Sequence, residues 1–352
     1  MKEIAEKFKK GWWHWGIYAL KIALGSSVAI FIANLLGLQF ATQAGVICVF
    51  SMLATAKDTI KISFVRMVSY VVTAIGAAIA FYFFKSEWMA YGVYIFITLF
   101  FAEMMGWQAA LAANVVAGTH FFSIDVFTFG VVINEFYIIC LGQIVALILN
   151  TMRNTDELEV QLRNAIRDIQ GKMKGLLLDT IDYIESDGQN KQVWPALKDT
   201  MDRLDYYILK SAEFEGNKFD GDAGYYLRYF EMRKSQLMVI RNLHGELRRM
   251  KEMPVQAQVI ATYIAYMSEY VTELNVPNKQ LEYMAEIFKQ MENEPLPTTR
   301  SEFENRACLY HVLMDLEDFL IIKKRYLEKE EKFKKNLKEI EEWKKNIEDL
   351  HD

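Results

Sequence analysis

The sequence lacks the residue patterns that several common classes of protein require. Its three cysteines, Cys48, Cys140 and Cys308, are isolated and form neither a metal motif nor a disulfide framework, which suits a reducing interior or a membrane. A glycine-rich phosphate loop of the Walker type is absent, so nothing indicates ATP hydrolysis. No Ser-His-Asp, Cys-His or paired-carboxylate pattern stands out, and His244 and His311 have no partner at metal-ligand spacing. The sequence therefore predicts no enzyme, no cofactor and no metal site.

Charged residues are scarce in the first part of the chain and abundant in the second. Residues 1–150 contain 9 Lys and Arg and 7 Asp and Glu, whereas residues 151–352 contain 31 and 38. The second part is acidic and mixes charges of both signs, which argues against nucleic-acid binding, because that requires a basic surface. We therefore predict a transmembrane domain over residues 1–150 and a cytosolic α-helical domain over residues 151–352.

Long uncharged runs in the first part predict six membrane spans. A bilayer core of about 30 Å takes about 20 helical residues, so the 35 uncharged residues between Lys21 and Lys57 are too many for one span. They suit two spans joined by a tight turn at residues 37–39, although a five-span alternative would merge them or discard the second. We expect spans at residues 17–36, 40–56, 62–84, 88–105, 107–123 and 127–149. The predicted fold is all-α, a polytopic six-helix bundle in the lipid bilayer followed by a cytosolic helical bundle.

The distribution of lysine and arginine predicts the orientation of these spans. Residues 2–10 contain four lysines, the expected loop after the second span carries Lys57 and Lys61, and Arg66 opens the third span. The expected outer loops carry one positive charge in total. Because lysine and arginine accumulate on the cytoplasmic side, both termini are predicted to be cytoplasmic.

Four of these basic residues are candidates for binding an anionic substrate. Lys21, Lys57, Lys61 and Arg66 all fall near the cytoplasmic end of the predicted spans, where a basic vestibule would concentrate anions. An arginine such as Arg66 can hold a carboxylate through two parallel hydrogen bonds. The alternative is that long cationic side chains near span ends reach the headgroups without any role in binding. This alternative is favoured for Lys57 and Lys61.

Three further ionisable residues fall inside predicted spans, where a charge costs about 2.5–3.5 kcal/mol. Glu103 lies near the cytoplasmic end, where we expect an ion pair with Arg66 or Lys21. His120 and Glu135 lie toward the outer ends of the fifth and sixth spans, and either could take up a proton, as proton coupling requires. Burial of a hydrogen-bonded histidine or glutamate without a transport role is the alternative.

The second part shows helical periodicity throughout. Its first helix is expected to continue from the sixth span, and breaks are expected at residues 186–190, 216–224, 254, 277 and 295–297. Ser301 and Glu304 have the spacing of a capping box at the start of a last helix that would reach about Leu350. Apolar residues near this end approach the spacing of a coiled coil, which favours a contact between two copies of the chain. A bundle with solvated outer faces is the alternative, and the two are compatible.

The stretch from Lys21 to Gly76 resembles the bacterial aromatic acid exporter family. The resemblance rests on an apolar span opened by Lys21, a short turn at Gly37-Leu38, a polar and basic loop, and a third span with Arg66 followed by small residues. The usual Gly-Thr pair after the arginine is replaced here by Ser69-Tyr70. The family is similar to fusaric-acid resistance proteins and to plant aluminium-activated malate channels. The resemblance implies a six-helix membrane domain in the bacterial plasma membrane, a homodimer, and export or conduction of small organic anions.

We therefore expect an exporter or channel for organic anions such as aromatic carboxylates, driven by the membrane potential or by a proton gradient. The alternative is a membrane-anchored interaction or sensor protein whose cytosolic bundle binds a partner. A continuous polar path through the membrane domain would favour transport, whereas a dry membrane domain and an exposed apolar groove on the cytosolic bundle would favour interaction.

Overall fold

The prediction of an all-α fold is confirmed. The structure is a computed structural model that describes residues 2–52, 55–122, 128–151, 155–189, 193–250 and 252–348. Over these residues it contains twelve α-helices and no strand. The chain divides into two units. The first comprises Met1–Thr155 with Gly216–Gly221, and the second comprises Asp156–Glu215 with Asp222–Asp352.

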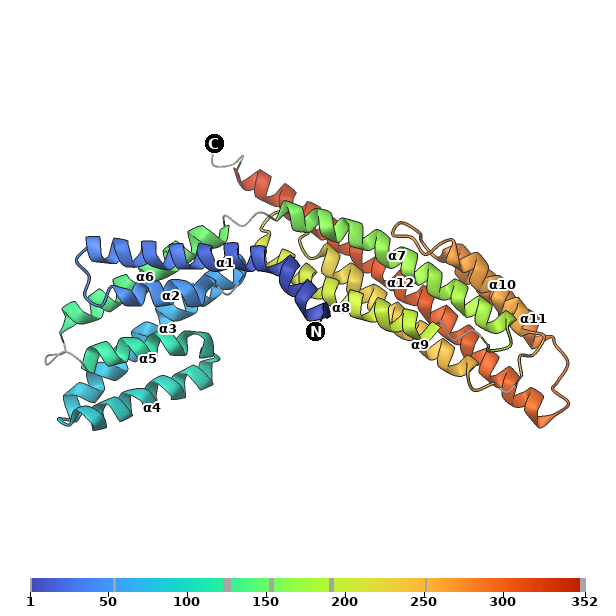
Figure 1. Ribbon diagram of the computed structural model, residues 1–352, viewed down its shortest axis with the longest axis horizontal. Helices are drawn as coiled ribbons and strands as arrows, with labels where there is room; N and C mark the ends of the chain where they lie inside the picture. Colours follow the sequence, from blue (N-terminus) through green and yellow to red (C-terminus); the bar gives the residue numbers. More distant parts are fainter. Residues whose placement is uncertain are drawn as a thin grey trace. The chain divides into compact units, whose positions relative to one another are not determined.

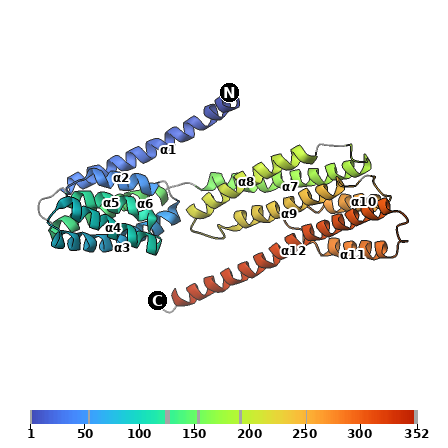
Figure 2. The same ribbon diagram turned by 90° about the horizontal axis from the view of Figure 1, so that it is seen from below.

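The first unit contains six helices that lie side by side (Figures 1 and 2). They are α1 (Lys2–Leu35), α2 (Thr42–Met52), α3 (Ala56–Phe83), α4 (Glu87–Met105), α5 (Gln108–Phe122) and α6 (Phe129–Thr151). Each helix overlaps one predicted span, although α1 begins well before its span and α3 begins before residue 62. Four of them are long and apolar enough to cross a membrane: the Gly16–Leu35 part of α1, α3, α4 and α6. The protein is therefore a helical membrane protein.

The helices α2 and α5 are shorter than the spans predicted for them. The 11 residues of α2 have a rise of about 16 Å and the 15 residues of α5 about 22 Å, against a bilayer core of about 30 Å. Seven residues of α2 are buried, so most of this helix packs against protein, whereas Val46 and Phe50 are about half exposed. The turn before α2 includes left-handed backbone at Gly37 (φ 67°) and Phe40 (φ 59°).

Small residues allow α2 to pack directly on α6. A Cβ added to Gly142 of α6 would lie 2.5 Å from the backbone oxygen of Ala44 and 2.9 Å from Cβ of Ile47, both in α2. Close approach through small residues is how helices associate where lipid tails offer equal apolar contact. Gly142 is therefore a requirement of this packing.

Lys57 and Lys61 do not lie in a loop, contrary to the prediction. Both belong to the first two turns of α3, which begins at Ala56. The reason is an N-terminal cap that we did not anticipate: the side chain of Thr55 accepts a hydrogen bond from the backbone nitrogen of Asp58. Asp58 also places an acidic group at the positive end of the helix.

The second unit is built from six helices with solvated outer faces. They are α7 (Asp156–Glu185), α8 (Val193–Asn217), α9 (Tyr225–Leu247), α10 (Ala257–Ser268), α11 (Asn278–Glu292) and α12 (Arg300–Glu348). The predicted breaks fall between helices, except that α8 includes the first two residues of the break predicted at residues 216–224. The prediction that α7 continues from α6 is wrong: α6 ends at Thr151, and Thr155 is not helical.

The start of α12 is capped two residues earlier than predicted. Thr299 accepts a hydrogen bond from the backbone nitrogen of Glu302 at 3.1 Å, and the Glu302 carboxylate accepts one from the backbone nitrogen of Thr298 at 2.8 Å. The spacing of Ser301 and Glu304 was therefore misleading. The side chains near the end of α12, on which the predicted contact between two copies depends, lie outside the described residues, and that contact stays a prediction.

Candidate functional site in the first unit

Buried polar side chains lie in the interior of the first unit. They come from four helices: Ser51 of α2, Thr59, Arg66 and Ser69 of α3, Asn114 of α5, and Glu135, Gln143 and Asn150 of α6. The outward surfaces of the first unit carry large apolar side chains, among them Leu24 and Phe31 of α1, Phe64 of α3 and Phe96 of α4. Polar groups within a membrane bundle face its interior, and these form a polar column.

Arg66 lies in this column without a counter-ion. Its side chain is only 5% exposed. One guanidinium nitrogen, Nη1, donates to Oγ of Ser51 at 2.5 Å, and Nε has no partner. The hydroxyl of Ser51 donates in turn to the backbone oxygen of Ile47 at 2.8 Å. Among the residues that the structure describes, no carboxylate pairs with Arg66.

The other predicted anion-binding residues are placed differently from Arg66. Lys57 and Lys61 are exposed on α3, and Lys21 is half-buried on α1. The four predicted residues thus share one end of the first unit, but only the guanidinium of Arg66 is enclosed in the polar column.

Glu103 does not form the predicted ion pair. It is exposed near the end of α4, and its Oε2 accepts a hydrogen bond from Nε2 of Gln108 at 3.2 Å. Within the described part of the chain, neither Arg66 nor Lys21 contacts its carboxylate. The left-handed residue Gly106 (φ 69°) ends α4 between the two side chains and brings them together.

His120 and Glu135, which were considered separately in the sequence, form a pair. Nδ1 of His120 lies 3.0 Å from Oε1 of Glu135. Glu135 is fully buried, and its second oxygen, Oε2, has no partner. The imidazole stacks on the ring of Phe40, with 4.0 Å between centroids. A buried carboxylate in contact with one imidazole is a group that can hold a proton.

A second set of hydrogen bonds lies between Arg66 and this pair. Nδ2 of Asn114 donates to Oγ of Ser69 at 2.9 Å, and the Tyr94 hydroxyl donates to the backbone oxygen of Asn114 at 2.5 Å. Oδ1 of Asn114 and Nε2 of Gln143 are buried without a partner. Buried polar atoms normally have partners, so unsatisfied ones indicate a ligand, water or ion site.

The sequence reasoning missed Ser51, Thr59 and Asn150 at the α2–α3 end of the first unit. Nδ2 of Asn150 donates to Oγ1 of Thr59 at 2.7 Å, and Oγ1 of Thr59 donates to the backbone oxygen of Ser51 at 3.1 Å. Short hydroxyl side chains are common in membrane helices, so only one signal was available: Asn150 is a strongly polar residue in an apolar run.

An apolar groove of about 440 Å³ lies between α3 and α6. One wall is formed by Tyr70 and Ala74 of α3 and the other by Phe129, Val132 and Phe136 of α6. Tyr70 follows Arg66 by one helical turn, and its hydroxyl donates to the backbone oxygen of Val132 at 2.7 Å. Aromatic surface therefore lies one turn from the buried guanidinium.

Two family profiles match nearly the whole chain. The profile described as aromatic acid exporter family member 1 matches residues 14–152, and that of the aromatic acid exporter C-terminal domain matches residues 159–324. The chain belongs to the aromatic acid exporter family. The family is described as one of membrane exporters, so the match of both units to its profiles supports a membrane transporter.

The chain is also similar to two individual proteins. The uncharacterized protein YqjA of Bacillus subtilis (strain 168) is 27% identical over 318 residues, covering 88% of this chain and 95% of the relative. A crystal structure of a membrane protein from Clostridium difficile 630 is 26% identical, with a TM-score of 0.43, and covers 47% of this chain and 98% of that chain.

Proposed function

We propose that this protein exports small organic anions, aromatic carboxylates among them, through the polar column of the first unit, with Arg66 as the anion-binding group. The observation that carries the proposal is the burial of the Arg66 guanidinium without any described carboxylate partner. A buried charge is costly unless it is paired. A substrate carboxylate would supply the missing charge and two acceptor oxygens.

The surroundings of Arg66 favour a transient anion over a permanent one. Ser51, Ser69 and Asn114 are neutral, and Nε of Arg66 remains an unpartnered donor that an anion could accept from. Neutral hydroxyl and amide groups can solvate a passing carboxylate without holding it permanently. The exposed lysines Lys57 and Lys61 would raise the local anion concentration at the entrance.

The apolar groove beside Tyr70 supports a substrate with an aromatic ring. A carboxylate at Arg66 would leave the ring of its substrate near the aromatic side chains of Tyr70 and Phe136. The placement of Tyr70 one turn after Arg66 gives α3 both functions: charge recognition and ring contact.

Two driving forces are available to such an exporter. The membrane potential favours outward movement of an anion by about 2.3 kcal/mol per charge for each 100 mV. The His120–Glu135 pair provides the second, because a proton taken up there from outside can be exchanged for the anion. Glu103, which is exposed, has no part in this mechanism.

We also propose that all six helices of the first unit lie within the bilayer, with both chain termini in the cytoplasm and the second unit in the cytosol. The burial of α2 supports this arrangement, since a helix too short to span is tolerated when protein surrounds it. The basic residues at one end of the helices support this orientation, because lysine and arginine accumulate on the cytoplasmic side of the bilayer.

Flux through the purified protein in liposomes tests the proposed function. Benzoate and cyclohexanecarboxylate form a matched pair of probes, because they carry the same charge and differ in the aromatic ring. Each is measured under an imposed potential, with and without a pH gradient. We expect flux of both anions and faster flux of benzoate.

The outcomes separate the parts of the proposal. Flux that follows the potential alone identifies a channel or uniporter, and flux that requires the pH gradient assigns coupling to His120 and Glu135. No flux of any organic anion by folded, oriented protein would overturn the proposal. That result would favour the alternative function, in which the protein binds a partner through its cytosolic bundle.

A further inference from the structure

The turn between α1 and α2 contains a backbone conformation that its residue does not favour. Phe40 has a φ of 59°, in the left-handed region that glycine adopts freely and bulky side chains rarely adopt. Among the described residues other than glycine, only Asp187 also has a positive φ. Such conformations persist only where surrounding contacts impose them, and they cluster at functional sites. A glycine would form the same turn more easily, so the contact made by the phenylalanine ring is the feature to explain.

That contact is a stack on the imidazole of His120. The two ring centroids lie 4.0 Å apart, and the ring planes are inclined by only 7°. Nδ1 of the same imidazole lies 3.0 Å from Oε1 of Glu135, whose side chain is fully buried, whereas the His120 side chain is 16% exposed. His120 is therefore the link between a buried carboxylate and the surface, and Phe40 covers one face of it.

Asn134 of α6 holds the turn in this position. Its Oδ1 accepts a hydrogen bond from the backbone nitrogen of Gln39 at 2.8 Å, and its Nδ2 donates to the backbone oxygen of Gln39 at 3.0 Å. One side chain thus fixes both backbone polar groups of the residue before Phe40. Asn134 directly precedes Glu135 in α6, so the anchor of the turn and the carboxylate of the pair are adjacent residues of one helix.

The cover has a consequence for any proton that the pair holds. A half-buried imidazole exchanges its proton with water wherever water can reach the ring. An apolar ring stacked on one face excludes water from that face, and exclusion of water prevents proton leakage from an enclosed site. Exchange of a proton for an anion is efficient only when protons do not pass in the absence of the anion.

We propose that Asn134 is a positioning residue for the His120–Glu135 pair. By binding the backbone of Gln39, it keeps the ring of Phe40 on the imidazole and so shields the pair from water. This inference rests on the proposed function only in giving the pair its role in proton exchange.

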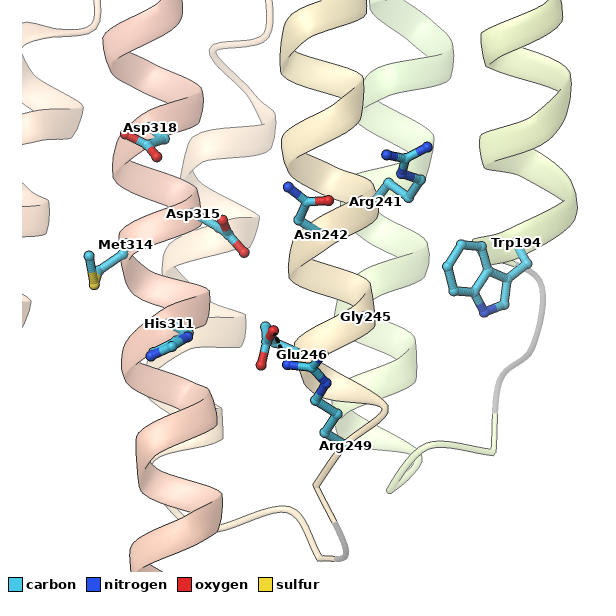
Figure 3. Close-up of a pocket in the computed structure, with 10 residues that line it drawn as sticks. All are labelled: Trp194, Arg241, Asn242, Gly245, Glu246, Arg249, His311, Met314, Asp315 and Asp318. Atoms are coloured by element: carbon cyan, nitrogen blue, oxygen red, sulfur yellow. Dashed lines mark hydrogen bonds and ion pairs between the residues drawn. The ribbon is translucent and has the colours of Figure 1, made fainter.

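The rate at which diethyl pyrocarbonate modifies His120 tests the cover directly. The reagent carbethoxylates accessible imidazole nitrogens, and mass spectrometry of peptides from the full chain in detergent gives the rate for each histidine. His311 is the internal reference, because it is exposed on α12 beside a polar groove of the second unit (Figure 3). Modification of His120 should be slow relative to His311 in the natural protein.

Two variants should remove the cover. Asn134→Leu loses both hydrogen bonds to the turn, which should raise the fraction of open turns, and with it the rate at His120, about tenfold. Phe40→Gly should raise the rate at least as much, because the ring itself is absent and the backbone conformation is retained. Phe40→Tyr keeps the ring and should react as the natural protein does.

Two controls separate the cover from a general loosening of the first unit. Asn150→Leu makes the same substitution at the other end of α6, where it removes the hydrogen bond to Oγ1 of Thr59, and it should leave the rate at His120 unchanged. Cys48 is fully buried in α2 and should stay protected from N-ethylmaleimide in every variant.

Proton leak into liposomes shows whether the cover serves the pair. A pH gradient is imposed without any organic anion, and the internal pH is followed with a fluorescent dye. Leak through the natural protein should stay near that of empty liposomes, whereas leak through Asn134→Leu should be several-fold faster.

Three results would overturn the proposal. They are unchanged reactivity of His120 in both Asn134→Leu and Phe40→Gly, reaction of Cys48 in step with His120, and an exposed His120 with the leak of the natural protein. Absence of benzoate flux through the natural protein would overturn the transport function instead, and the reactivity of His120 would still decide whether Asn134 holds the cover.

Discussion

Replacing Arg66 by methionine should lower anion flux and leave the protein equally stable or more stable. Methionine has a similar length and no charge. The change removes one hydrogen bond, from Nη1 to Ser51 at 2.5 Å, but it also removes a buried charge that has no described counter-ion. Replacing buried charges by apolar side chains of similar volume is often neutral or stabilising by about 1–4 kcal/mol. The unfolding temperature should therefore not fall.

The expected loss of flux follows from the bond that the substrate would make. A hydrogen bond to a charged group contributes about 1.5–3 kcal/mol, and a factor of ten in binding corresponds to about 1.4 kcal/mol. Flux at low benzoate concentration should therefore fall about 10- to 100-fold in Arg66→Met. Arg66→Lys keeps the charge but loses the planar pair of donors. Its flux should therefore lie between that of the natural protein and that of Arg66→Met.

The assay is benzoate flux in liposomes, paired with thermal unfolding of the same preparation. Lys85→Met is the matched control, because Lys85 is exposed in the turn after α3 and its loss changes the net charge equally. Flux in this control should stay within about twofold of the natural protein. A large fall in stability of Arg66→Met, with unchanged flux per folded molecule, would refute the reasoning and make Arg66 a structural residue.

Three further predictions follow from the two units. Gly142→Ala should strongly lower the thermal stability of the protein, because the added Cβ would lie 2.5 Å from the backbone of α2. Gly92→Ala is the control, since a Cβ there meets nothing within 4 Å and should leave the stability unchanged. Equal stabilities of the two variants would contradict the packing of α2 on α6. Glu135→Gln should abolish any dependence of flux on the pH gradient while flux driven by potential persists, and retained pH coupling would exclude this pair. Burial lowers the pKa of His244 to about 4, so the folded state binds fewer protons than the unfolded state between pH 6.5 and 4. Stability should fall over this range by about 2–3 kcal/mol as pH falls, and His244→Phe should flatten that dependence in thermal unfolding.

The positions of the helices could be predicted because the signals for them are local. Uncharged runs located all six helices of the first unit, and prolines, glycines and polar breaks located those of the second. The errors fell at helix ends, where one hydrogen bond decides the boundary. The cap on Thr55 moved Lys57 and Lys61 from a loop into α3, and the cap on Thr299 displaced the start of α12.

The candidate site could be predicted only in part, because it depends on which faces of separate helices meet. Arg66 was identifiable as a charge in an apolar run, but its burial and its lack of a carboxylate partner depend on packing. His120 and Glu135 were each identifiable, yet their contact joins residues on different helices. Glu103 was paired with the wrong residues because Gly106, which ends α4, directs it toward Gln108.

The shortness of α2 explains why polar side chains gather at one end of the first unit. A helix leaves its last carbonyl groups without partners, and α2 ends inside the bundle. The Tyr18 hydroxyl donates to the backbone oxygen of Met52 at 3.1 Å, and Thr59 donates to that of Ser51 at 3.1 Å. These bonds complete the end of the helix and account for the tyrosine and the threonine as structural groups.

The hydrogen bonds that complete the end of α2 do not explain why Arg66 carries a charge. Its guanidinium donates to the Ser51 hydroxyl and not to any of the open carbonyls, and the same hydroxyl already donates to Ile47. Thr59 and Asn150 already donate to the end of α2 without a charge, and the positive charge of Arg66 adds a favourable interaction with the helix dipole there. The proposed binding of an organic anion would supply the counter-charge that the described residues do not give Arg66.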